Sequence, residues 1–190
     1  MRRSIALLAF AIALPALAQT EIGVHVAGAR ANSTVDASGT TIAFDRGRGL
    51  GASIAFGGDV TLELAATALR YDGALRADGA SASAGTLRLV PVTATAQWHF
   101  GSAYVGAGGA YVVAHDLSSA DLESLGIGTI DIESKRCWLA NAGVAFHLRN
   151  FAVVVDGKYI DYRPESGPAD ARVRLNLKPV VISLGLRFKL

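Results

Sequence analysis

The histidines are the side chains of this sequence best suited to metal binding or acid–base chemistry. Three of the four, His25, His99 and His147, fall within segments in which apolar and polar residues alternate. Zinc needs ligands that converge to about 2.0–2.2 Å from the metal, usually from short and recognisable spacings. These histidines come from three separate segments, so we expect no metal site and no cofactor.

A second set of reactive residue types begins at the fourth histidine. His115, Asp116 and Ser118 have the side chains of a hydrolytic triad, but a nucleophile meets its base through the fold and not through adjacency in sequence. The glycines at Gly106–Gly109 fail as a dinucleotide-binding motif, because Tyr111 stands where the third glycine belongs and no helix is expected to follow. We interpret these glycines as sites where a sheet packs against large neighbours, and we expect no enzymatic activity.

The start of the chain predicts a secretory signal. Two arginines follow the first residue, and the apolar run Ile5–Leu14 leads to small residues at Ala16 and Ala18. The run is too short to span a bilayer as a helix, which needs about 20 apolar residues. We expect residues 1–18 to be removed, which leaves 19–190 as a single exported domain.

Charge and cysteine content restrict the remaining function classes. The chain has 18 Lys and Arg against 16 Asp and Glu, and loss of the two arginines in the signal leaves 16 of each sign. A neutral mature chain without a basic stripe predicts no nucleic-acid partner. The single Cys137 excludes an intrachain disulfide. No run of 18 apolar residues follows the signal, so the chain is either a soluble β domain or a closed barrel in the outer membrane.

Alternating segments predict the elements that position any site. Eight strands are expected, over about Glu21–Arg30, Gly49–Gly57, Asp59–Arg70, Thr86–Phe100, Ala103–Ala114, Arg136–Leu148, Phe151–Tyr162 and Arg172–Leu190. The connections after the second, fourth and sixth strands are tight hairpins, whereas the other connections are long and polar. Short turns at one edge and long loops at the other are typical of outer-membrane barrels, whose termini face the periplasm.

The aromatic residues favour a barrel over a soluble sandwich. On the apolar faces of the expected strands, one group lies near the short turns and a second group lies near the long loops. The first comprises Phe56, Trp98, Phe100, Phe146, Phe151 and Phe188, and the second Tyr111, Trp138 and Tyr159. Two such rings suit the two lipid–water interfaces of a membrane. We therefore predict an all-β, eight-stranded antiparallel up-and-down transmembrane β-barrel, integral to the bacterial outer membrane.

The last expected strand breaks the alternation. Val173, Leu175 and Leu177 occupy odd positions, whereas the apolar residues after Pro179 occupy even positions. Since a slip of one residue exchanges the two faces of a strand, the sequence predicts a bulge near Lys178 and Pro179.

Several blocks of the sequence resemble the OmpW-type outer membrane proteins. The strongest is VPVTATAQWHFGSAYVGAGGAY at Val90–Tyr111; LELAAT at Leu62–Thr67, WLANAGVAF at Trp138–Phe146 and VRLNLKPVVISLGLRF at Val173–Phe188 are similar too. The resemblance implies an eight-stranded barrel that passes or binds small hydrophobic molecules and has roles in envelope stress. It differs at the last position, where such barrels commonly carry an aromatic residue and this chain has Leu190.

The lumen of an eight-stranded barrel holds side chains or one small ligand. Near the short turns we expect a polar plug of ion pairs and hydrogen bonds. Its residues are His25, Glu63, Gln97, His99, His147, Asp156, Lys158 and Arg187, with Lys189 beside them. An ion-conducting path through the same residues is the alternative. Near the long loops the lumen should be less charged and lined by Leu69, Pro91, Thr93, Leu139, Asn141 and Ile160. The Leu and Ile residues of 122–132 are expected to cap it.

These residues lead to a function hypothesis, which is binding or passage of a small hydrophobic molecule through the upper lumen. A closed structural or adhesive barrel that acts through its surface loops is the first alternative, and a lipid-modifying barrel enzyme is the second. The expected partners are outer-membrane lipid, the assembly machinery that reads the C-terminal strand, and the small hydrophobic ligand.

Overall fold

The fold comes from a computed structural model of the chain. It describes residues 20–31, 35–37, 40–77, 80–115, 131–166 and 173–190. The predicted signal at 1–18 lies outside the described residues. In the part of the chain that is described, no helix is long and apolar enough to cross a membrane.

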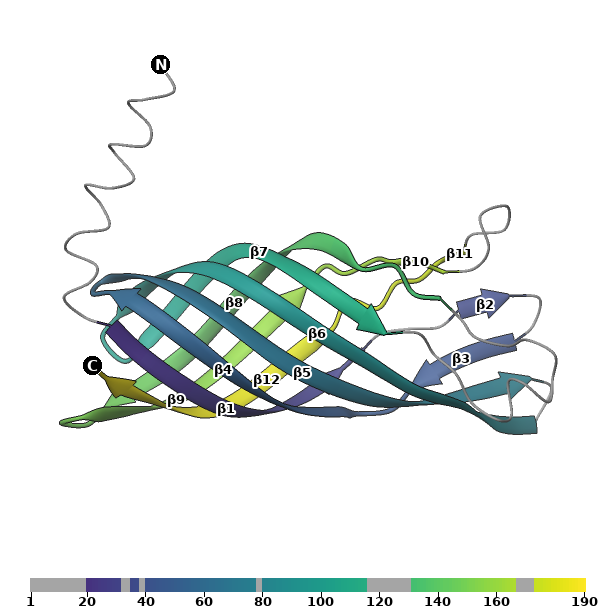
Figure 1. The fold of residues 1–190 in the computed structure, drawn as a ribbon, viewed down its shortest axis with the longest axis horizontal. Coiled ribbons are helices and arrows are strands. Elements are labelled where there is room, and N and C mark those ends of the chain that lie inside the picture. The colour runs from purple at the N-terminus through teal and green to yellow at the C-terminus, as the bar shows by residue number, and fades with distance from the viewer. Residues whose placement is uncertain (1–19, 32–34, 38–39, 78–79, 116–130, 167–172) are drawn as a thin grey trace, which may run out of the picture.

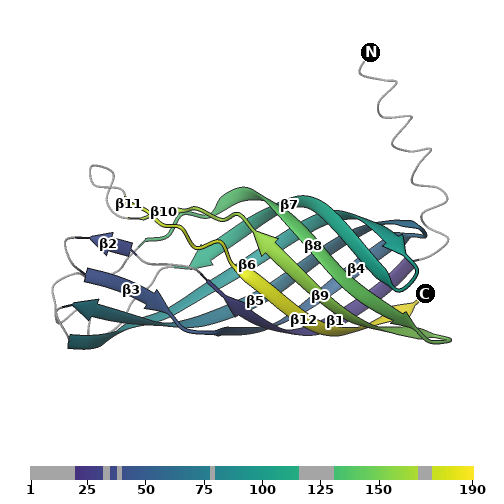
Figure 2. The same ribbon diagram turned by 180° about the vertical axis from the view of Figure 1, so that it is seen from behind.

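Eight strands form a closed antiparallel barrel (Figures 1 and 2). In order around the ring they are β1 (Thr20–Arg30), β4 (Gly47–Gly57), β5 (Val60–Ala77), β6 (Ala80–Phe100), β7 (Ala103–His115), β8 (Lys135–His147), β9 (Phe151–Ile160) and β12 (Val180–Lys189). Strand β12 pairs with both β9 and β1, which closes the ring. The predicted eight-stranded up-and-down barrel is confirmed.

Three tight turns lie at one end of the barrel, here called the short-turn end. The turns after β4 and β6 place Gly57 and Gly101 at φ values of 127° and 64°, a region that glycine enters without steric cost. The start of β1 and the end of β12 lie at this same end, where the amide of Leu190 donates to the carbonyl of Thr20 at 2.9 Å. The opposite end, here called the long-loop end, carries the remaining connections.

A hairpin extends the barrel at the long-loop end. Strands β5 and β6 stay paired to Ala77 and Ala80, well beyond the barrel, and β3 (Thr40–Phe44) pairs with the outer part of β5. The short β2 (Val35–Ala37) then pairs with β3. The prediction of a loop over 71–85 was wrong, because outside the membrane a strand needs no continuous apolar face. The backbone ladder holds this pairing, together with side-chain contacts of Thr86 to Arg70 and Asp72.

The C-terminal segment also differs from the prediction. It does not form one strand from 172 to 190: β11 (Val173–Arg174) pairs with β10 (Glu165–Ser166), and β12 begins only at Val180. The faces do not exchange at Lys178, because Leu175, Leu177 and Val181 are all buried inside. The expected exchange of faces was wrong, since odd-numbered apolar residues here face an apolar interior and not lipid. The backbone is nevertheless irregular at the predicted place, where Lys178 has a φ of 32°.

The outer face of the barrel is apolar along most of its length. Leu50, Ile182 and Leu184 are exposed over 67%, 61% and 53% of their surface. Aromatic side chains stand at both ends of this band, with the Phe151 and Phe188 rings 6.4 Å apart near the short turns and the Trp138 and Tyr159 rings 5.6 Å apart near the long loops. Such a band with aromatic borders is what a membrane barrel presents to lipid.

Candidate functional site

The lumen is divided into two layers of opposite character. The charged layer consists of Glu63, Asp156, Lys158 and Arg187, all buried in the half near the short turns. The apolar cluster fills the other half and consists of Ala27, Ala29, Ala31, Leu69, Tyr71, Leu87, Leu89, Ala110, Val112, Ile132, Leu139, Ile160, Tyr162, Leu175, Leu177 and Val181. Inward positions of the barrel strands supply the charged layer and most of the apolar cluster.

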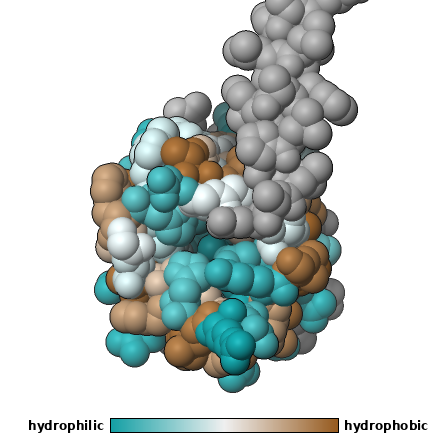
Figure 3. Space-filling model, turned by 90° about the vertical axis from the view of Figure 1, so that its left-hand side faces the viewer, coloured by the Kyte–Doolittle hydropathy of each residue, from teal (hydrophilic) through white to brown (hydrophobic). Residues whose placement is uncertain are grey.

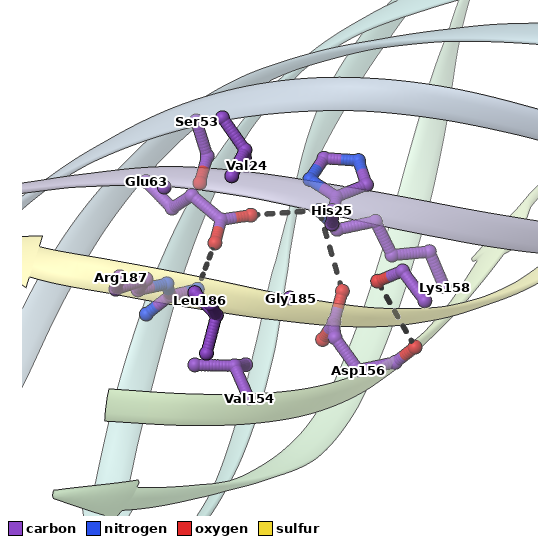
Figure 4. Close-up of a pocket in the computed structure, with 12 residues that line it drawn as sticks. Val24, His25, Ser53, Glu63, Val154, Asp156, Lys158, Gly185, Leu186 and Arg187 are labelled. Carbon is purple, nitrogen blue, oxygen red and sulfur yellow. Dashed lines mark hydrogen bonds and ion pairs between the residues drawn. The ribbon is translucent and has the colours of Figure 1, made fainter. Parts of the chain in front are cut away.

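The charged layer is held by ion pairs across the lumen (Figure 4). Lys158 of β9 donates to Glu63 of β5 at 2.7 Å, and Arg187 of β12 donates to the other oxygen of the same carboxylate. The Lys158 ammonium also lies 3.3 Å from Oδ2 of Asp156. Two carboxylates therefore balance two cations in a space from which water is largely excluded, which is the arrangement that buried charges require.

Two neutral side chains complete the coordination of Asp156. Its Oδ1 accepts a hydrogen bond from the Tyr104 hydroxyl at 2.8 Å and one from the Asn141 amide at 3.1 Å. Oδ2 accepts no well-aligned hydrogen bond from the described residues, so its contact with Lys158 is chiefly electrostatic. The sequence analysis missed Tyr104, although strict alternation along β7 from the outward Tyr111 places it inside.

His25 stands at the upper edge of the charged layer. Its Nε2 lies 2.9 Å from the Thr67 hydroxyl, within hydrogen-bonding distance. Both cross-strand neighbours of His25 are glycines, Gly51 of β4 and Gly185 of β12. A Cβ atom at either position would collide with the His25 side chain, so the glycines make room for the imidazole inside the barrel wall.

The space left within the charged layer is small. The cavity between His25, Ser53, Glu63 and Asp156 has a volume of about 20 Å³, which holds a water molecule and no organic ligand. These four side chains leave no room for an organic molecule between them, and a polar plug that seals the lumen stays a prediction.

A wider cavity opens below this layer at the short-turn end. It has a volume of about 240 Å³, and His99, Asp59 and Arg187 are among its lining residues. Figure 3 shows this end, with hydrophilic residues across its middle and hydrophobic residues toward its rim. Two residues expected inside the plug, His147 and Lys189, are exposed here instead, because the strands end at this level.

The three histidines expected on inward faces do not come together. His25 contacts Thr67, the His99 ring stacks on Tyr104 at 5.2 Å, and His147 lies 3.7 Å from the carboxylate of Glu21. Among the described residues, no three His, Cys, Asp or Glu side chains are grouped closely enough to hold a metal ion.

The structure places most of the predicted upper-lumen residues inside the upper half of the barrel. Leu69, Leu139 and Ile160 belong to the apolar cluster, and Pro91 and Thr93 are buried on β6. Asn141 lies instead beside the charged layer, where it contacts Asp156. Tyr71, Leu87, Leu89 and Val112 also belong to the apolar cluster and were not predicted there. The inward position of Tyr71 follows from alternation once β5 is known to continue past Arg70, whereas the other three lie within predicted strands.

Residues from outside the barrel strands cover the apolar cluster. Ile132, Leu175 and Leu177 are buried against it, and none of them lies in a barrel strand. Tyr162 joins them, donating its hydroxyl to the carbonyl of Glu133 at 2.6 Å, and burial raises its pKa. Ile132 belongs to the segment expected to cap the lumen, while Leu122, Leu125, Ile127 and Ile130 lie outside the described residues.

Comparison with protein-family models gives a match over residues 11–190, to the model described as the OmpW family. The chain belongs to the OmpW family. It is an integral outer-membrane protein, as the sequence predicted. The comparison with curated proteins gives no match.

Solved barrels share the fold of this OmpW-family chain at low sequence identity. The outer membrane protein OprG from Pseudomonas aeruginosa has a TM-score of 0.77 at 16% identity, over 90% of this chain and 95% of that one. The outer membrane protein AlkL in lipid bilayers has a TM-score of 0.61 at 14% identity, over 90% of each chain. Neisserial surface protein A has a TM-score of 0.60 at 17% identity, over 90% and 97%.

Of the triad-like residues of the OmpW-family chain, His115 alone is among the described residues, and it lies apart from both layers of the lumen. His115 ends β7 on the outside of the barrel and is exposed, while Asp116 and Ser118 lie outside the described residues. Gly106 and Gly108 of β7 fit their interpretation as packing sites, whereas a Cβ at Gly109 would lie 3.9 Å from its nearest neighbour. A Cβ on Gly106 would come within 2.5 Å of the Asn141 amide oxygen.

The contact between Tyr104 and Asp156 depends on a glycine opposite the ring. A Cβ at Gly143 of β8 would collide with the Tyr104 phenol, whereas one at Gly157 of β9 would stay 3.6 Å from its nearest neighbour. We expect Gly143→Ala to displace Tyr104 from Asp156 and to lower the free energy of unfolding by about 1–3 kcal/mol. Gly157→Ala is the matched control. Urea titration of the folded barrel measures both, and equal stabilities for the two variants would contradict the expectation.

Proposed function

We propose that the OmpW-family chain binds a small hydrophobic molecule, which enters the upper lumen from the long-loop end. In barrels of this kind that end faces the cell exterior. The observation that supports the proposal is the change of character along a single inward face: β9 directs Asp156 and Lys158 into the charged layer and Ile160 into the apolar cluster. The free energy of an apolar solute falls when it moves from water into such an interior.

The cover of the apolar cluster supports entry from this end. Ile132, Leu175 and Leu177 close the cluster, and they lie in segments without barrel-strand pairing. Moving these segments aside breaks backbone hydrogen bonds such as those from Leu175 to Pro164 and from Lys178 to Tyr162, and leaves the ladder between the eight barrel strands intact. When these side chains move away, the apolar cluster loses contacts, and an apolar ligand in their place would restore those contacts.

The charged layer opposes straight passage of the same molecule toward the short-turn end. An apolar solute would have to separate Lys158 and Arg187 from Glu63, and it could not replace the hydrogen bonds that these groups lose. Capture in the upper lumen is therefore the step that we propose.

One buried polar atom indicates the chemistry of the ligand. The side chain of Tyr71 is fully buried in the apolar cluster, and among the described residues its hydroxyl has no hydrogen-bond partner. An unpaired buried hydroxyl costs about 1–3 kcal/mol. A hydrophobic molecule with a single polar group would satisfy this hydroxyl, so we propose an alcohol-like or ketone-like ligand over a pure hydrocarbon.

Thermal unfolding of the purified barrel in detergent tests the proposal, with n-octanol and n-octane as probes. We expect both probes to raise Tm, and octanol to raise it more. Leu139→Asp should abolish both shifts, because it places a charge within the apolar cluster. Tyr71→Phe should remove only the advantage of octanol over octane.

Leu148→Asp is the matched control, since it introduces the same charge at an exposed position in the turn after β8. It should leave both ligand-induced shifts unchanged. Equal shifts in the wild type and in Leu139→Asp would contradict binding in the upper lumen.

The extended hairpin favours a second candidate function, which is contact with partners at the cell surface. Strands β5 and β6 contain 18 and 21 residues, whereas a tilted transmembrane strand needs about 9–11. Replacing residues 75–82 by Asn-Gly would shorten this hairpin with a two-residue turn. Loss of cell adhesion with unchanged octanol binding would favour the surface function over ligand capture.

A further inference from the structure

Arginines follow the apolar residues on the outer face of the barrel at its long-loop end. On five strands an exposed arginine follows the last apolar residue of the outward face. These are Arg30 on β1, Arg48 on β4, Arg70 on β5, Arg88 on β6 and Arg136 on β8. On β4 the last outward apolar residue is Leu50, and on β8 it is Trp138. The arginines therefore form a collar just beyond the apolar band.

Three arginines of the collar lie in one continuous row. The strand register pairs Arg48 directly with Arg70, and Arg70 directly with Arg88, across the neighbouring strands β4, β5 and β6. Directly opposed residues on one face of a sheet have Cβ atoms about 4.5–5.5 Å apart, and like charges in this arrangement repel. An anion between or beside the guanidinium groups would remove this repulsion.

The described residues supply only part of this negative charge. Asp72 lies 3.8 Å from the Arg70 guanidinium, and the Thr86 hydroxyl bridges the two side chains with contacts of 3.3 Å to each. Within the described residues, no carboxylate forms an ion pair with Arg48 or Arg88. The nearby Asp45 and Arg46, both exposed in the break between β3 and β4, cancel each other in charge.

We infer that the row Arg48–Arg70–Arg88 binds the phosphate groups of an anionic lipid in the outer leaflet. The guanidinium group matches phosphate because its planar donors form two parallel hydrogen bonds with one oxyanion. The side chains of the row point outward from the barrel wall at the border of the apolar band. Lipid headgroups lie at this level, so a lipid phosphate can reach the row from the surrounding leaflet. A phosphorylated glycolipid such as lipid A has this chemistry. The inference does not depend on the contents of the lumen.

The test uses the folded full-length barrel in detergent and measures the affinity for diphosphoryl lipid A. The triple variant R48Q/R70Q/R88Q should bind on the order of a hundredfold more weakly, since each cation near an anionic lipid surface contributes roughly a factor of five. The control variant R149Q/R163Q/K189Q removes three exposed cations elsewhere and should bind like the wild type. Heat-modifiable migration on gels checks that each variant is folded.

Three results would overturn the inference. The first is equal affinity of the triple variant and the wild type. The second is equal affinity of the wild type for dephosphorylated lipid A, which would assign binding to the acyl chains. The third is equally tight binding of inorganic phosphate or sucrose octasulfate, which would assign the row to a soluble anion. If the triple variant does not fold, the single variants R48Q and R88Q should each bind about fivefold more weakly, and unchanged affinity in both would overturn the inference.

Discussion

Glu63→Gln is expected to lower the free energy of unfolding of the barrel by about 3–5 kcal/mol. The wild-type carboxylate accepts hydrogen bonds from both Lys158 and Arg187, and its side chain is only 2% exposed. The amide removes the negative charge and leaves two buried cations with Asp156 as their only carboxylate in the charged layer. Urea unfolding of the barrel in phospholipid vesicles measures the loss.

A second substitution separates charge imbalance from the loss of shape. In Glu63→Gln combined with Arg187→Gln, the Lys158–Asp156 pair remains and the charged layer is neutral again, so we expect this double variant to be more stable than Glu63→Gln alone. Asp72→Asn is the surface control. It breaks a pair that is 3.8 Å long and largely exposed, and its effect should stay below about 1 kcal/mol. Equal losses for Glu63→Gln and Asp72→Asn would show that the charged layer does not stabilise the barrel.

The sequence alone predicted the barrel and its charged layer because both rest on the alternation of side chains along strands. Glu63, Asp156 and Arg187 are polar residues at inward positions of strongly alternating segments, and the closed ring brings them together whatever the detailed stagger. The partner of each charge was not predictable, since it depends on the stagger between strands. The position of Asn141 depends on the same stagger, which lowers it from the expected upper lumen to Asp156.

Two physical causes account for the errors in the strand prediction. The apolar residues of the last segment were assigned to the lipid side, an assignment that holds only where the lumen is polar. In the upper half the lumen is apolar too, so Leu175 and Leu177 point inward. In the sequence they therefore look like lipid-facing residues on a strand shifted by one position. Beyond the membrane neither face needs to be apolar, and the polar stretch at 71–85 therefore gave no sign of the extended β5–β6 hairpin.

Leu184→Lys is expected to destabilise the barrel by about 2–4 kcal/mol and to reduce the folded fraction in the membrane. Leu184 lies midway along the closing strand β12, and its cross-strand neighbours are Val26 of β1 and Val155 of β9. All three side chains are exposed on the outside, over 53%, 55% and 40% of their surface. A charge at their centre would lie in hydrocarbon with no polar group beside it.

The size of this loss of stability shows whether lipid or water surrounds the outer face. On a soluble barrel, a lysine at an exposed leucine position is nearly neutral for stability and increases solubility. Asn176→Lys gives that baseline on the same segment, since Asn176 is exposed before β12 begins, and we expect it to change stability by less than about 0.5 kcal/mol. Folding yield in vesicles and heat-modifiable migration measure both variants. A fully folded Leu184→Lys barrel as stable as Asn176→Lys would place the apolar band outside the hydrocarbon, and the arginine collar would then no longer mark a headgroup layer.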